Sequence, residues 1–139
     1  MKISKKIFEE IVNTVPYSPF ETGGFLGGKG DTVLKVVYDC EKSNFASYQP
    51  NNNLLNSSLS EWQQNEIDFL GIFHTHYPSC ASLSACDEEY IKEIMQNLKN
   101  EISVLYFPIV IAKKEMCVYK AEFKASKLSI KPDKLTLLG

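Results

Sequence analysis

Apolar residues recur along this chain with two different periods, and the longer period predicts two helices. A first helical stripe runs between Ser4 and Val15 and consists of Ile7, Phe8, Ile11, Val12 and Val15. The spacing i, i+1, i+4, i+5, i+8 is that of an amphipathic helix. A second stripe, from about Ala85 to Asn97, consists of Tyr90, Ile91, Ile94, Met95 and Leu98. Each predicted helix therefore has one face to bury.

Shorter β-branched and aromatic runs predict strands between and after these helices. A glycine-rich run, 23–28, precedes Val33–Tyr38, and Gly30 and Asp31 between them indicate the turn of a hairpin. The segment Phe69–His76 is typical of a buried strand that ends in polar residues.

The last part of the chain predicts a further hairpin. Strands over 104–112 and 116–123 flank a polar turn, and the end of the chain has room for one short strand. Pro108 has no backbone N–H, so it favours an edge or a bulge at that point.

Residues 43–60 are rich in Asn and Ser and are interpreted as a long connection. Loops of this length inside a domain are usually functional or mobile. No repeat or boundary divides the chain, so residues 1–139 are expected to form a single α+β domain. Its expected architecture is a central mixed, mostly antiparallel sheet flanked by two helices.

Charge and composition exclude some classes of partner. With 15 basic and 17 acidic side chains the formal charge is −2, which provides no general attraction for nucleic acid or an anionic membrane. Glu9 and Glu10 interrupt the apolar start, and no run approaches the roughly 20 apolar residues of a spanning helix, so a cytoplasmic protein is expected. The four cysteines form no CxxC pair and are expected to be free thiols.

The two histidines of the chain, His74 and His76, are two residues apart on the strand predicted over 69–76. Side chains at i and i+2 of a strand project from the same face, so both imidazoles can bind one ion. Zinc suits these ligands, and a carboxylate such as Asp87 would supply a third while water takes the fourth position. Three protein ligands are the number of a catalytic site.

Ser84 and Asp87 also have the spacing of a capping box at the start of the second helix. This structural role is compatible with metal binding, because the positive end of a helix favours the ionised carboxylate that a metal needs. A proton acceptor near the water could be Glu21, Asp39, Glu61 or Glu66. Glu21 stands at the mouth of the glycine-rich segment, although a solvated loop glutamate is the simpler interpretation of this residue alone.

Three parts of the sequence follow one another with a fixed spacing: ETGGFLGG, then GIFHTH, and then, after seven further residues, Ser84, which two residues separate from Asp87. This pattern resembles the JAMM motif of the JAB1/MPN/Mov34 metalloprotease family. The resemblance implies a three-layer-like MPN/JAB fold and a Zn²⁺ held by His74, His76 and Asp87. It also implies that Glu21 is the general base and that Ser84 stabilises the tetrahedral intermediate. One departure is Tyr77, which stands where the family usually has the proline that follows the second histidine; here Pro78 follows Tyr77.

The same resemblance implies a zinc-dependent peptidase or isopeptidase that cleaves after the C-terminal Gly-Gly of a ubiquitin-like protein. Gly23, Gly24 and Gly27 would give backbone access to an extended tail, and Tyr77 would line the substrate groove or pack in its loop. Two other functions stay open. One is processing of a β-grasp sulphur-carrier protein, and the other is a non-catalytic MPN scaffold that only binds partners.

Overall fold

A mixed eight-stranded sheet and three helices make up the described part of the chain in a computed structural model. The structure describes residues 1–15, 22–39, 48, 50–76 and 82–139. The elements follow one another as β1 (Lys2–Ser4), α1 (Lys5–Thr14), β2 (Gly23–Lys29), β3 (Thr32–Asp39), α2 (Asn52–Gln64), β4 (Asp68–Thr75), α3 (Ala85–Leu98), β5 (Val104–Ile111), β6 (Glu115–Lys124), β7 (Lys127–Asp133) and β8 (Thr136–Leu138).

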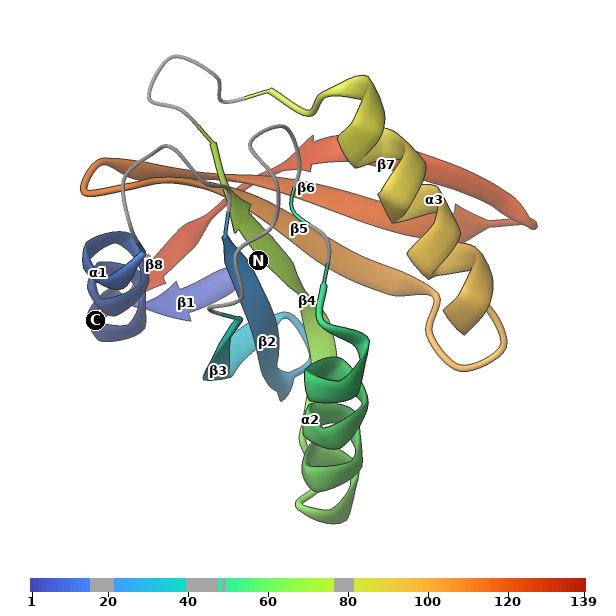
Figure 1. Cartoon of the computed structure of the whole chain (residues 1–139), viewed down its shortest axis with the longest axis horizontal. Coiled ribbons are helices and arrows are strands. Elements are labelled where there is room, and N and C mark those ends of the chain that lie inside the picture. Colours follow the sequence, from blue (N-terminus) through green and yellow to red (C-terminus); the bar gives the residue numbers. More distant parts are fainter. Residues whose placement is uncertain (16–21, 40–47, 49, 77–81) are drawn as a thin grey trace.

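The strands lie in the order β7-β6-β5-β4-β2-β3-β1-β8. Pairings β2–β3, β2–β4, β5–β6 and β6–β7 are antiparallel, and β1–β3, β1–β8 and β4–β5 are parallel. The sheet curls strongly, so that β5, β6 and β7 cross the direction of β2 and β4 (Figure 1). The predicted α+β class and mixed, mostly antiparallel sheet are therefore confirmed, as are both hairpins.

Two details of the predicted strands were wrong. Pro108 lies neither on an edge strand nor at a bulge, because β5 lies between β4 and β6 and keeps a constant register with both. The parallel register pairs Gly71 with Tyr106 and His74 with Ile109, on either side of the proline. The end of the chain forms two strands where one was predicted, because β7 continues the meander from β6 while β8 returns to pair with β1.

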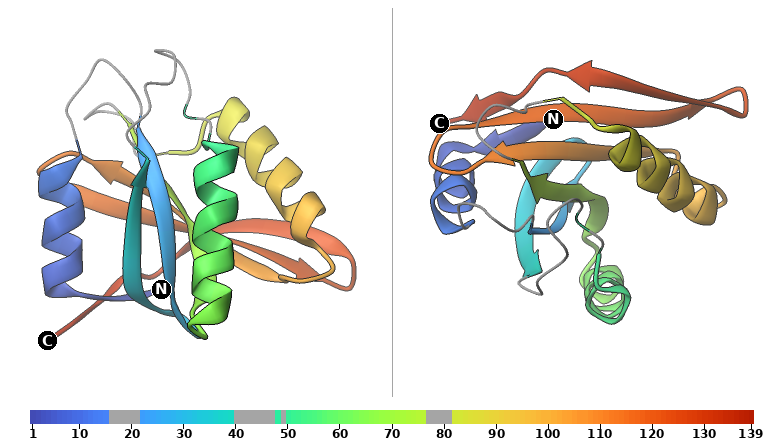
Figure 2. Two further views of the ribbon diagram at one scale, coloured as in Figure 1. Left: turned by 60° about the horizontal axis from the view of Figure 1, so that its bottom comes forward. Right: turned by 45° about the horizontal axis from the view of Figure 1, so that its top comes forward.

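The helices cover the two faces of the sheet unequally. Helix α1 begins after Ser4, whose side chain accepts a hydrogen bond from Ile7 N (3.1 Å), and it buries Ile11 and Val12 on one face. Helices α2 and α3 bury Trp62, Ile91 and Met95 on the other face. Figure 2 shows α1 apart from the α2–α3 pair. The prediction of two helices was wrong, since three are present in the described ranges. None of these three helices is long and apolar enough to cross a membrane.

Helix α2 begins in the segment 43–60, which was predicted to be a long connection, and continues beyond it to Gln64. The side chain of Asn51 accepts a hydrogen bond from Leu54 N (3.1 Å) and caps the helix. Its apolar residues form a stripe that packs on the sheet, namely Leu54, Leu55, Leu59 and Trp62. The hydroxyl of Ser58 donates to the Leu54 carbonyl, so the serine is accommodated inside the helix. Tertiary burial of this stripe overrides the low helix propensity of Asn and Ser.

An irregularity in β4 decides which face its side chains occupy. Leu26 pairs with Gly71 but Gly27 pairs with Phe69, so Leu70 is an extra residue in β4. Phe69 and Ile72 consequently both belong to the apolar cluster on the α2–α3 face, although they are three residues apart. A bulge reverses the alternation of a strand in this way, and it directs the side chain of His74 toward α3.

Candidate metal centre

His74 and His76 meet at the end of β4. Their Nε2 atoms lie 2.9 Å apart, and their ring centroids are separated by 4.7 Å. His74 is fully buried, and 6% of the His76 side chain is exposed. The expectation that the two imidazoles share one side of the strand is met.

Asp87 reaches the same point from the first turn of α3. Its Oδ1 lies 3.2 Å from His74 Nε2 and its Oδ2 lies 3.0 Å from His76 Nε2. The predicted capping box holds this carboxylate, because Ser84 N donates to Asp87 Oδ2 (2.9 Å) and Asp87 N donates to Ser84 Oγ (3.1 Å). The Ser84 oxygen acts as an acceptor in this contact, so its hydroxyl hydrogen is available for a further bond.

Burial and pairing set the charge of these groups. Burial of the imidazole lowers the pKa of His74 and outweighs the opposing effect of Asp87, so the ring is neutral. Burial by itself would raise the pKa of Asp87, but hydrogen bonds to His74 and His76 and the Ser84 backbone N–H hold that pKa far below its usual range. Neutral imidazoles and an ionised carboxylate are the protonation states that metal ligands need.

The donor set fits a zinc ion. One ligand atom each from His74, His76 and Asp87 lies within 4.8 Å of the others. Neighbouring ligands of a tetrahedral zinc, with metal–ligand distances near 2.0–2.1 Å, are about 3.3 Å apart. The two Nε2 atoms are 2.9 Å apart, and each lies within 3.2 Å of one Asp87 oxygen, Oδ1 for His74 and Oδ2 for His76, so both imidazoles and the carboxylate are within the range of such neighbouring ligands.

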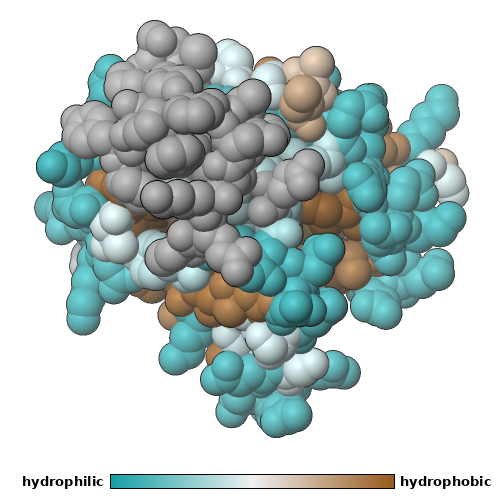
Figure 3. All heavy atoms as spheres, viewed as in Figure 1, coloured by the Kyte–Doolittle hydropathy of each residue, from teal (hydrophilic) through white to brown (hydrophobic). Residues whose placement is uncertain are grey.

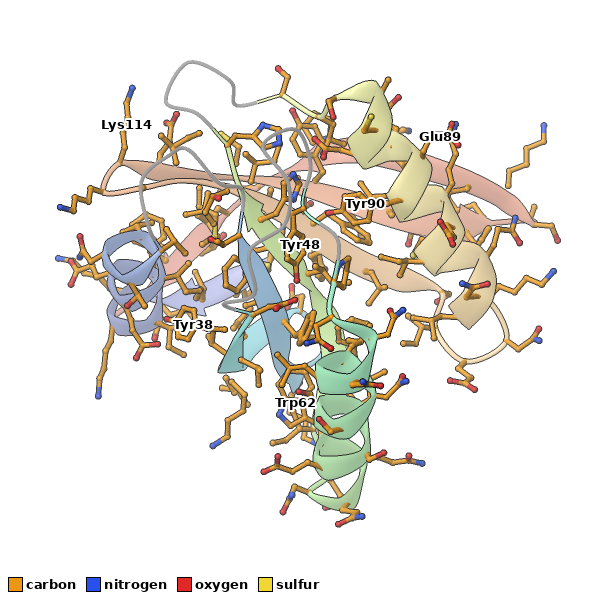
Figure 4. All side chains as sticks on the ribbon, in the orientation of Figure 1. Tyr38, Tyr48, Trp62, Glu89, Tyr90 and Lys114 are labelled. Atoms are coloured by element: carbon orange, nitrogen blue, oxygen red, sulfur yellow. The ribbon has the colours of Figure 1, made fainter. Side chains whose placement is uncertain are left out.

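Two tyrosines that the sequence analysis did not single out as site residues contact His74. Tyr90 Oη lies 3.1 Å from His74 Nδ1, and the two rings meet edge to face. The Tyr48 ring lies nearly parallel to the imidazole, with centroids 6.3 Å apart, and its hydroxyl donates to Asp39 Oδ2 (2.7 Å). Figure 4 shows both tyrosines between the sheet and α3. Tyr90 follows Asp87 by three residues, a spacing that places both on one helix face and could have revealed it.

The glycines of β2 do not leave room for a substrate tail. Strand β2 lies between β3 and β4, so both of its backbone edges are paired. A Cβ on Gly23 would meet the Phe73 carbonyl and the Tyr48 ring, and one on Gly24 would meet the Phe73 ring. At Gly27 it would approach Trp62 to 3.0 Å. The expected backbone access at Gly23, Gly24 and Gly27 was therefore wrong, and these glycines allow core side chains to pack on the strand.

Glu21 and Tyr77 lie outside the described residues. The neighbour of Glu21 in the sequence, Thr22, continues the β2–β4 pairing beyond Gly23 and His74. Thr75 N donates to the Thr22 carbonyl (2.8 Å), and Thr22 N donates to Thr75 Oγ1 (2.9 Å). Among the other carboxylates considered as proton acceptors, Asp39 is buried and accepts hydrogen bonds from Tyr48 and Asn51.

A hollow of about 580 Å³ lies along α3, beside the two tyrosines that flank His74. Its lining consists of Tyr48, Ala85, Cys86, Glu89, Tyr90, Lys92, Glu93 and Gln96. Tyr90 contacts His74, the Tyr48 ring lies beside it, and Ala85 and Cys86 lie between Ser84 and Asp87 in the chain. In Figure 3 the outward surfaces of α2 and α3 are mainly hydrophilic, while apolar surface is visible between them.

The thiols of Cys86 and Cys117 are free, and Cys86 is exposed; Cys40 and Cys80 lie outside the described residues.

Comparisons with known proteins establish the fold alone. No family model matches the chain, and no curated protein matches it. A solution structure of a protein from Desulfitobacterium hafniense is similar with a TM-score of 0.65 and 19% identity, over 99% of this chain and 92% of that one. A solution structure of a protein from Salinibacter ruber is similar with a TM-score of 0.59 and 15% identity, over the same shares of both chains.

Proposed function

We propose that this protein is a zinc-dependent peptidase or isopeptidase of the JAMM type. The observation that carries the proposal is the convergence of His74, His76 and Asp87 from two elements on one buried point, with lowered pKa values that keep the His74 ring neutral and Asp87 ionised. A capping box explains the position of Asp87 but does not require two histidines beside it. The resemblance of the sequence to the JAMM motif assigns this convergence to hydrolysis, and it also carries the proposed MPN/JAB fold.

In this proposal His74, His76 and Asp87 hold Zn²⁺, which when bound acidifies water and polarises a carbonyl. Glu21 is proposed to accept the proton of the attacking water and to return it to the leaving amine. The hydroxyl of Ser84 is proposed to donate to the oxyanion, which is compatible with its cap because the cap uses the oxygen as an acceptor.

The proposed substrate is the C-terminal Gly-Gly tail of a ubiquitin-like protein. A tail without side chains can approach a buried centre more closely than a bulky one, and a misplacement of about 1 Å can cost about 10²-fold in rate. The hollow beside Tyr48 and Tyr90 supports an approach along α3. The closed edges of β2 argue against an approach by strand addition to that strand.

Metal binding is the first test. Protein purified without chelators and loaded with zinc should contain about one zinc per chain by elemental analysis, and His76→Ala and Asp87→Ala should lose it. The variant Ser84→Ala, which removes a cap but no ligand, should retain the metal. Wild-type protein that cannot be loaded with zinc would overturn the ligand assignment.

The second test separates the enzyme from a scaffold. A fusion of a ubiquitin-like protein carrying Gly-Gly and a short extension should be cut after the second glycine, as located by mass spectrometry. The variant Glu21→Gln should keep its zinc but lose about 10²–10⁴-fold in rate. Replacing the terminal Gly of the substrate by Val should abolish cleavage. Cleavage of a β-grasp sulphur carrier only would favour the processing function, and a zinc-loaded protein inactive on both substrates would favour a scaffold.

A further inference from the structure

The Nδ1 atom of His74 faces Tyr90, on the side of the ring opposite the metal ligands. His74 is fully buried, so a partner for Nδ1 must come from the protein, and Tyr90 Oη lies 3.1 Å away. We propose that Tyr90 is a positioning residue of the metal centre: its hydroxyl holds the His74 ring in both the metal-free and the zinc-loaded protein. This inference rests on the proposed metal site.

A hydroxyl is suited to this task because it both donates and accepts. In the metal-free protein, a proton on His74 Nε2 can be donated to Asp87 Oδ1, 3.2 Å away, and Nδ1 then accepts from the Tyr90 hydroxyl. When Nε2 binds a metal it must present its lone pair, so the proton of the neutral ring resides on Nδ1. Tyr90 Oη then accepts from Nδ1–H. A phenylalanine could serve neither state.

The fold holds Tyr90 firmly enough for this role. Tyr90 stands three residues after Asp87 on α3, so one helix carries both a ligand and the partner of another ligand. The Tyr90 ring also packs edge to face on Phe107 of β5, with centroids 6.0 Å apart. This packing does not involve the hydroxyl, so Tyr90→Phe should fold with its ring in place. Outer-shell partners of this kind commonly change metal affinity by about 10–100-fold.

The test compares Tyr90→Phe with Tyr48→Phe. Both changes remove one tyrosine hydroxyl beside His74, but the Tyr48 hydroxyl bonds to Asp39. Zinc affinity is measured by competition with a chromophoric chelator, and folding is checked by amide NMR spectra. Tyr90→Phe should bind zinc about 10–100-fold more weakly, while Tyr48→Phe keeps the wild-type affinity. Equal affinities of wild-type protein and Tyr90→Phe, or equal losses in both variants, would overturn the inference.

A second measurement uses the wild-type protein alone. Long-range ¹H–¹⁵N spectra of the imidazoles should show His74 protonated on Nε2 without metal and on Nδ1 with zinc. The same Nδ1-protonated tautomer in both states would contradict the proposed change of donor, even if Tyr90→Phe failed to fold. Wild-type protein that binds no zinc would instead refute the proposed function.

Discussion

Asp87 illustrates how one side chain serves the helix and the candidate metal centre together. Its Oδ2 accepts from Ser84 N and also lies beside His76, while Oδ1 faces His74. The cap needs an oxygen acceptor, whereas a metal needs a charged carboxylate. These two requirements can be separated by substitution.

Asp87→Asn should keep the cap and lose the metal. The amide oxygen can still accept from Ser84 N, so helix content by circular dichroism should be unchanged. Zinc affinity should fall by more than the roughly 10–100-fold typical of outer-shell changes. Asp87→Ala is the comparison, because it should also lose about 0.5–2 kcal/mol of stability with the cap. An Asn variant that binds zinc like the wild type would remove Asp87 from the ligand set.

His74 should make the metal-free protein sensitive to mild acid. Burial lowers the pKa of His74 below its ordinary value, so between the folded and unfolded pKa values the unfolded chain binds more protons. The titration of His74 therefore does not reduce the free energy of unfolding above about pH 6.5. Below that pH the free energy of unfolding falls as the pH falls, by at most about 1.4 kcal/mol per pH unit for this one group. Urea unfolding of metal-free protein across this range measures the slope. His74→Gln should flatten it, and an unchanged slope would contradict the burial argument.

At the scale of elements, α2 is joined to the sheet through Trp62 and the glycine beneath it. Trp62 is 5% exposed, lies against Gly27 and packs near Phe69 with centroids 6.5 Å apart. Trp62 is the most buried apolar side chain of the stripe on α2, so we expect its packing to stabilise the helix more than its cap does. Glycine at position 27 allows this close packing, because a Cβ there would lie only 3.0 Å from the indole.

Removing the indole should therefore cost more than removing the cap of α2. Trp62→Ala should destabilise the fold by about 3–5 kcal/mol, and Asn51→Ala by about 0.5–2 kcal/mol. Urea unfolding followed by circular dichroism compares the two variants without relying on tryptophan fluorescence. A smaller loss in Trp62→Ala than in Asn51→Ala would show that capping, and not burial, stabilises this helix.

For the whole molecule, the candidate metal centre links a strand and a helix that are separate elements of the chain. His74 belongs to the central strand β4, while Asp87 belongs to α3, which lies over β5 and β6. A ligand that binds only the folded arrangement stabilises it by mass action. Zinc should therefore act on global stability as well as on the site.

At a free zinc concentration of 100 times Kd, the gain should be about 2.7 kcal/mol. For a domain of this size that corresponds to a rise in Tm on the order of 10 °C. Differential scanning calorimetry with and without zinc measures it, and magnesium at the same concentration is the control. The rise should be absent in His76→Ala; an equal rise in that variant would mean that zinc binds elsewhere.

The local patterns of the sequence were sufficient for most of the elements and for the candidate ligands. Apolar periodicity located α1, α3 and the strands β2 to β6, because period and capping are properties of neighbouring residues. The two-residue spacing of His74 and His76 and the Ser84–Asp87 box are local in the same sense. Glu21 stays a prediction from the resemblance.

Tertiary structure alone decided the features that depend on distant contacts. Helix α2 exists because its stripe is buried on the sheet, and the glycines of β2 accommodate Tyr48, Phe73 and Trp62 instead of a substrate. The extra residue Leu70 turns His74 toward α3, where Tyr90 meets it. The sequence pattern of a strand predicts that alternate side chains share a face. Which face of the sheet they occupy depends on the register of the strand with its neighbours, and register is a property of the assembled sheet.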